Sequence, residues 1–172
     1  TVQTPFAYLG YKTLRGMAKH QLQGMPSNSI YQVGNYIDHE LVNHIEEDTA
    51  QRLERIKTKQ PLRILLPVGG AGAGQKVFQE LINHLMPLIE TKQIQLLINF
   101  GDHNNVYQYL QERIPKFNKL TKVCFNDYQH IEKMAHNFNG FNDGIYAIYH
   151  QDIYQAVYST NLLMRVSDIL IT

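Results

Sequence analysis

The stretch RILLPVGGAGAGQ, residues 63–75, decides the fold. Residues 63–68 form a short apolar run, typical of a strand that is covered on both faces. Glycines follow at once at positions 69, 70, 72 and 74, and beyond Gln75 apolar residues recur at three- and four-residue spacing over 77–89. A strand, a glycine-rich turn and an amphipathic helix in this order predict the first unit of a parallel sheet.

The same alternation continues to the end of the chain. Short apolar runs at 94–100, 122–125, 145–149 and 168–172 predict four more strands, and periodic stretches between them predict the intervening helices. The expected fold is therefore α/β, with a doubly wound, Rossmann-like parallel sheet. Asp127 and Asp152 stand where helix N-caps are expected.

Residues 1–60 differ from the rest and predict a helical hinge and the end of a preceding domain. Asp38 is expected to cap one helix that carries apolar residues as far as Ile56. The charged segment RIKTKQP, residues 55–61, is the predicted boundary before a nucleotide-binding domain over 61–172.

Composition excludes several classes of protein. The 172 residues hold 16 Lys and Arg against 15 Asp and Glu, so there is no electrostatic case for a nucleic-acid partner. Cys124 is the one cysteine, which rules out an internal disulfide, and no apolar run approaches the roughly 20 residues of a membrane span. We expect a cytoplasmic protein. Because the chain starts at Thr1 and its final strand has barely begun, we also expect a piece of a longer protein.

The glycine-rich turn predicts an anion site. Glycines let a ligand approach backbone N–H groups, and the start of the following helix adds partial positive charge, which suits a phosphate or diphosphate. The dinucleotide fingerprint GxGxxG fails, because Gln75 or Val77 occupies its last position. The Walker pattern also fails, because Gln75 stands where the lysine is required.

Polar residues follow the second and fourth predicted strands. Gly101, Asp102 and His103 end the second, and His150 ends the fourth. The carboxyl ends of parallel strands adjoin the ligand crevice, so both histidines are candidate hydrogen-bonding partners of a nucleotide or sugar. We expect no metal, because no D-x-D pair occurs and His39 and His44 diverge on a helix by roughly 140°.

With these residues in view, the chain resembles the carboxyl half of a GT-B glycosyltransferase. The related group contains monogalactosyldiacylglycerol synthase, processive diacylglycerol glucosyltransferase and the peptidoglycan enzyme MurG. Residues 18–38 (AKHQLQGMPSNSIYQVGNYID) resemble the passage out of the family's first domain, and 63–75 resemble its donor-phosphate loop. INFGDHN at 98–104 and STNLLMRVSDILIT at 159–172 resemble two later family segments.

The resemblance implies that this half binds a nucleotide diphosphate sugar, such as a UDP-sugar, without a metal or cofactor. The acceptor would be a lipid at a membrane surface or another cell-envelope molecule, so the domain would work peripherally to the membrane. The implied donor site comprises Gly69, Gly70, Gly72, Gly74, Gln75, Gly101, Asp102, His103 and His150.

The chain also departs from the family pattern. An additional strand and helix run from Lys122 to about Asn139, and the chain stops at Thr172, where the family continues into an acidic residue that holds the donor. The catalytic base of the first domain is missing, so we expect no turnover by this chain alone.

Two alternatives stay open. One is a dinucleotide-binding oxidoreductase module in which Asp102 binds the ribose. Asp102 lies 33 residues after Gly69, however, whereas the fingerprint expects roughly 20. The other is a non-catalytic module whose final strand completes its sheet with another chain, for example in a homo-oligomer, or with a missing segment.

Overall fold

The computed structural model describes residues 8–9, 26–69, 72, 74–136 and 143–172. The chain divides into two compact units, Thr1–Asp38 and His39–Thr172. The first unit contains the short 3-10 helix η1 (Ser27–Ser29), and residues 18–25 of the segment 18–38 lie outside the described residues. The second unit contains the sheet together with residues 39–60, which the sequence analysis assigned to the hinge.

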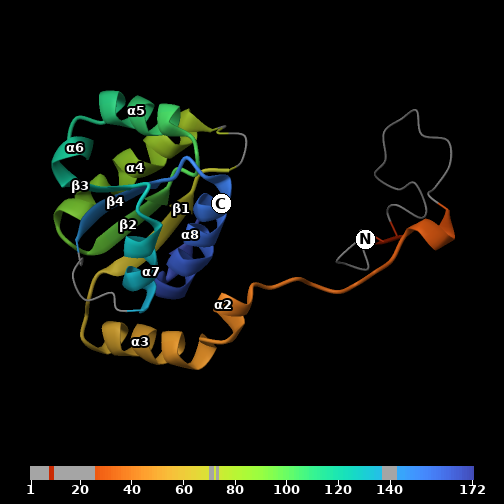
Figure 1. Ribbon diagram of the computed structural model, residues 1–172. Helices are drawn as coiled ribbons and strands as arrows, with labels where there is room; N and C mark the ends of the chain where they lie inside the picture. Colours follow the sequence, from red (N-terminus) through yellow and green to blue (C-terminus); the bar gives the residue numbers. More distant parts are fainter. Residues whose placement is uncertain (1–7, 10–25, 70–71, 73, 137–142) are drawn as a thin grey trace. The chain divides into compact units, whose positions relative to one another are not determined.

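The second unit is built on one five-stranded sheet whose strands all run parallel (Figure 1). The strands lie in the order β3-β4-β2-β1-β5. Their bounds are β1 (Leu62–Pro67), β2 (Ile94–Asn99), β3 (Thr121–Phe125), β4 (Gly144–Tyr149) and β5 (Ile169–Leu170). The predicted α/β class with a doubly wound parallel sheet is confirmed.

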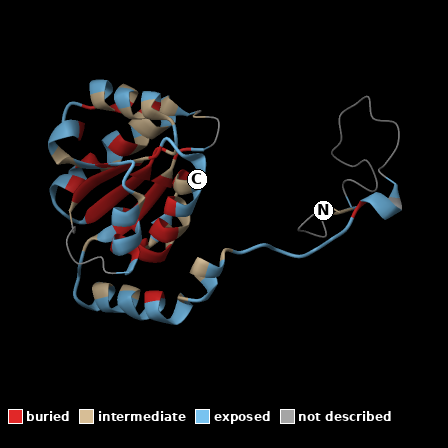
Figure 2. Ribbon diagram, viewed as in Figure 1, coloured by how far each residue is buried: buried red, intermediate tan, exposed pale blue. Residues whose placement is uncertain are grey.

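Helices cover both faces of this sheet. One face carries α4 (Gln75–Glu90), α5 (Asn104–Arg113) and the short α6 (Phe117–Leu120), and the other carries α7 (Tyr128–His136) and α8 (Ile153–Val166). Alternate residues of β1 and β2 point to opposite faces, so Leu66 and Leu96 pack under α4 while Leu65 and Leu97 pack under α8. The buried residues gather along the central strands (Figure 2).

The strand order creates one switch point. The chain leaves β2 for α5 on one face and leaves the neighbouring β4 for α8 on the other. In open parallel sheets a crevice forms outside the carboxyl ends of two such strands, because their connections separate there. The fold therefore puts its candidate ligand crevice beside the ends of β2 and β4.

The single helix expected after Asp38 is instead two helices, α2 (His39–Val42) and α3 (Ile45–Lys57). The imidazole Nδ1 of His44 lies 2.9 Å from the Glu40 carbonyl oxygen and takes the acceptor that a continuous helix would use.

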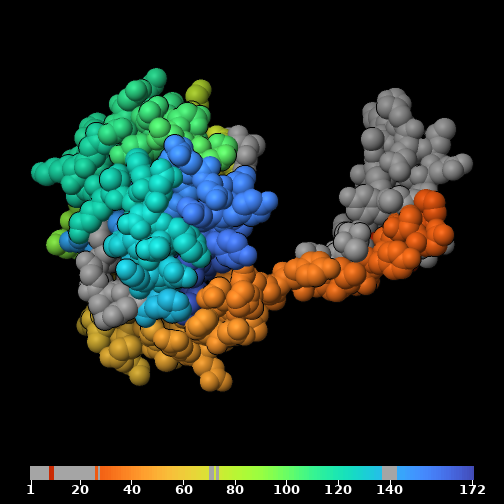
Figure 3. All heavy atoms as spheres, in the orientation of Figure 1, coloured from red at the N-terminus to blue at the C-terminus, as the bar shows by residue number. Residues whose placement is uncertain are grey.

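In Figure 3 the atoms of α7 and α8 form a continuous surface. No helix among the described ranges is long and apolar enough to cross a membrane.

Candidate functional site

The glycine turn leaves the sheet directly after β1. The N–H of Val68 still donates to the Asn99 carbonyl at 2.8 Å, and the N–H of Gly72 turns back to the Gly69 carbonyl at 2.8 Å. Gly72 and Gly74 have φ angles of +59° and +89°, a region that other residues rarely adopt. Gly70, predicted to be part of the donor site, lies outside the described residues. The turn is therefore tight and depends on glycine at two described positions.

This turn leads into the N-terminus of α4, whose N-cap residue makes no side-chain hydrogen bond. Gly74 is the N-cap of α4, and as a glycine it has no side chain that could accept a hydrogen bond from the first turn, which Gln75 begins. The first N–H groups of a helix have no acceptor within the helix, and they carry partial positive charge. This end of α4 is therefore suited to an anion.

The imidazole of His103 packs against the turn. A Cβ atom on Gly72 would lie 2.9 Å from Nδ1 of His103, so only glycine fits beside that ring. The other nitrogen, Nε2, is buried and has no hydrogen-bond partner among the described residues. It lies 3.5 Å from a carboxylate oxygen of Asp102. The ring of His103 thus lies between the glycine turn, on its Nδ1 side, and the Asp102 carboxylate, on its Nε2 side.

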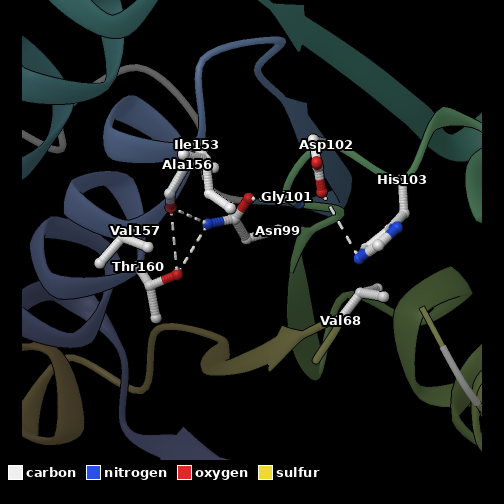
Figure 4. Close-up of a pocket in the computed structure, with 9 residues that line it drawn as sticks. All are labelled: Val68, Asn99, Gly101, Asp102, His103, Ile153, Ala156, Val157 and Thr160. Carbon is white, nitrogen blue, oxygen red and sulfur yellow. Dashed lines mark hydrogen bonds and ion pairs between the residues drawn. The ribbon is translucent and has the colours of Figure 1, made fainter. Parts of the chain in front are cut away.

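A cleft of about 410 Å3, including its open mouth, lies at this place. Gly101, with a φ of +60°, and the 45%-exposed side chain of Asp102 form its polar wall together with His103. The opposite wall is mainly apolar and comes from the end of β1 and from α8 (Figure 4). The lining residues are Val68, Asn99, Gly101, Asp102, His103, Ile153, Ala156, Val157 and Thr160. The structure therefore brings three predicted residues into one cleft, and Gly72 lies directly behind His103.

Asn99 lines the cleft and was not among the residues predicted for the site. Its Nδ2 donates to the Ala156 carbonyl and to Thr160 Oγ1, both at 2.8 Å, and its Oδ1 accepts the Gly101 N–H at 3.0 Å. The side chain is buried, so these bonds tie the end of β2 firmly to α8. The available signal was an asparagine directly after the apolar run Leu96–Ile98.

His150 takes a different place from the one expected. It is fully buried, and its backbone N–H donates to the Gly101 carbonyl at 3.0 Å. The ring nitrogen Nε2 lies 2.9 Å from Ser159 Oγ. Burial lowers the pKa of His150 below its ordinary value. It does not line the cleft, so its contacts support the residues at the end of β2 from behind.

The N-terminus of α8 is already capped by a side chain of the protein. The Asp152 carboxylate accepts the N–H groups of Tyr154 at 2.8 Å and Gln155 at 3.4 Å, which confirms the predicted N-cap. A carboxylate already bound there repels a second anion. The start of α4, which lacks such a side chain, is therefore the better anion site of the two helices.

Comparison with known protein families places most of the chain in a family. The family described as "Domain of unknown function (DUF6938)" matches residues 25–172. No curated protein and no solved structure matches the chain.

Proposed function

This chain belongs to the DUF6938 family, and on that premise we propose that the second unit binds a nucleotide diphosphate sugar in the cleft between the α4 turn and α8. The diphosphate would lie at the start of α4, beside His103. The nucleotide and sugar would fill the cleft beyond, between Asp102 and the apolar wall of α8. The domain would then act as the donor-binding half of a glycosyltransferase.

One observation carries this proposal: His103 lines the cleft and its ring also packs against Gly72, in the glycine turn that leads into the start of α4. Backbone N–H groups at a helix start and an imidazole donor are the groups that proteins use for phosphate oxygens. The apolar side chains of Ile153 and Val157 on the other wall suit a ring system rather than a second charge. A ligand with an anionic end and a flat, less polar end fits both walls.

The acceptor belongs to the same proposal. As the sequence resemblance implies, it would be a lipid or cell-envelope molecule presented by another domain. The unit would then work in the cytoplasm, at times against a membrane surface. Binding of the donor would not require the acceptor.

Calorimetric titration tests the proposal with UDP, UMP, UDP-glucose and UDP-galactose. We expect saturable binding of the diphosphates and at least tenfold weaker binding of UMP, because the second phosphate would be lost from the α4 start. His103→Gln should weaken UDP binding at least fivefold. The matched control is His84→Gln, which changes an exposed histidine on α4. Absence of saturable binding to every nucleotide would remove the proposal.

Asp102 supports a second candidate, the dinucleotide-binding module. Its exposed carboxylate lines the cleft just beyond β2, next to β1, where a ribose-binding acid stands in dinucleotide-binding folds. Fluorescence of NADH on addition of the protein separates the two candidates. Enhancement that Asp102→Asn abolishes, with no binding of UDP, would favour the dinucleotide.

A further inference from the structure

Helix α3 is attached to the rest of the second unit through charged side chains. Asp48, the one buried residue of α3, accepts from Nε and Nη2 of Arg165 at 3.1 and 3.2 Å. Arg52 Nη2 donates to the Ser167 carbonyl at 2.7 Å, and Arg55 donates to the carboxylate of the next residue along the chain. The face of α3 that contacts α8 and the residues after it is therefore polar.

The large apolar side chains of α3 lie on another face. Ile45, Leu53 and Ile56 are 58%, 52% and 56% exposed. At 100° per residue they fall, together with the exposed Thr49, within an arc of roughly 80° around the helix axis. The centre of this arc is roughly 90° away from the polar face described above. We call these four residues the apolar stripe.

This arrangement is the reverse of the usual one. A surface helix normally turns its apolar residues toward the core and its charged residues toward solvent. In α3 the buried residue is an aspartate and the large apolar residues are exposed, so most of the helix has the exposed colour in Figure 2. A continuous row of exposed apolar side chains marks a surface that binds another protein.

The charges of α3 indicate which protein that is. The first turn holds Glu46, Glu47 and Asp48, and the last turn holds Arg55 and Lys57. Glu46 and Lys57 are both exposed, and they lie roughly 20° apart around the axis, on the same side of the apolar stripe. A helix with an acidic start and a basic end is complementary in charge to an antiparallel copy of itself.

We propose that the apolar stripe binds the apolar stripe of a second copy of this chain, with the two α3 helices antiparallel. In a dimer with two-fold symmetry the same surface of each copy meets its own equivalent. Leu53 then packs beside Thr49 of the second copy, and Ile45 packs beside Ile56. Glu46 of each copy lies opposite Lys57 of the other, so both ends of the contact carry an ion pair.

The length of the helix sets the strength of this contact. The 13 residues of α3 span about 20 Å, so two such helices make an interface at the small end of the range for specific complexes. We therefore expect a reversible dimer that depends on protein concentration. The contact uses α3 and leaves the final strand β5 free of any role in it, and it does not depend on the function proposed for the cleft.

Sedimentation equilibrium of the whole chain at low ionic strength, over a series of protein concentrations, tests the proposal. We expect a monomer that converts reversibly to a dimer. Leu53→Glu places a charge in the middle of the stripe on both copies and should weaken dimerisation by roughly tenfold or more. The matched control is Val77→Glu, which changes a 64%-exposed apolar residue on α4 and should leave dimerisation unchanged. Circular dichroism checks that each variant is folded.

Exchange of the two flanking charges tests the antiparallel arrangement. Glu46→Lys or Lys57→Glu alone should weaken the dimer by roughly threefold or more, because like charges then face each other at both ends. The double variant should regain the wild-type affinity, because each pair is restored with its signs reversed. A wild-type chain that stays monomeric, as it would if residues 1–25 or another protein covered the stripe, would overturn the proposal. So would a dimer that Leu53→Glu leaves intact, or a double variant that dimerises no better than the single ones.

Discussion

The imidazole of His103 lies so close to Gly72 that a methyl group on the glycine α-carbon would come within 2.9 Å of Nδ1. The contact joins the turn after β1, which leads into α4, to the turn after β2. The anion site proposed above therefore depends on a glycine that a ligand does not need to touch.

Gly72→Ala tests that dependence. The alanine would be strained at a φ of +59° and would push His103 aside, so we expect a loss of about 1 to 3 kcal/mol in the free energy of unfolding. UDP affinity should fall with it. Chemical denaturation and calorimetry give the two values. Gly69→Ala is the matched control, because its Cβ would meet no atom within 4 Å. Equal stability of the two variants would contradict the contact.

Asn99→Ala should weaken the attachment of α8 to the end of β2 at the cleft. The substitution leaves the Gly101 N–H without its buried acceptor and removes both bonds to α8, so we expect a cost of about 1 to 3 kcal/mol. Hydrogen exchange should rise at residues 153–160 more than elsewhere. Asn83→Ala on the exposed side of α4 should change neither quantity. Unchanged exchange over 153–160 would show that Asn99 does not hold α8.

Stability should fall in mild acid because of His150. Burial lowers its pKa in the folded protein, whereas the unfolded chain titrates near 6.5. The unfolded state therefore binds more protons, and the stabilisation present above about pH 6.5 is lost as the pH falls through the folded-state value. Between pH 7.5 and 5, chemical denaturation should show that His150→Gln loses less of its free energy of unfolding than wild type does. The control His84→Gln should lose as much as wild type. An NMR titration that places His150 at or above 6.5 would refute this.

The buried pair of Arg165 and Asp48 should be costly to break from one side. Asp48→Ala leaves a guanidinium that is 1% exposed without its bidentate partner, and about 3 to 5 kcal/mol should be lost. The double variant Asp48→Leu with Arg165→Met should regain most of that loss, because no buried charge remains. Equilibrium denaturation of wild type, Asp48→Leu, Arg165→Met and the double variant measures the coupling. A double variant as unstable as Asp48→Ala would contradict the argument.

Local patterns predicted the fold well because burial follows short-range periodicity. The apolar runs predicted at 63–68 and 94–100 correspond to the central strands β1 and β2, and Asp152 is the N-cap of α8 as expected. The break between α2 and α3 was missed, since it arises from one side-chain bond of His44 to a carbonyl. Patterns of apolar residues do not report such competition.

The site was predictable only in part. Gly101, Asp102 and His103 line the cleft because they follow a strand, and their position in the chain is enough to place them there. Asn99 and His150 could not be placed in this way, because their roles depend on partners in α8. Which end residue faces the crevice and which turns inward is decided by packing between distant segments.

The strand order also limits how the molecule can fold. β4 lies between β2 and β3, so β2 gains its second neighbour only after a later part of the chain inserts beside it. The Asn99 bonds span 57 and 61 residues, which makes the cleft a product of high contact order. The opening would thus be completed late in folding, and the half-formed sheet would expose an apolar strand edge until then.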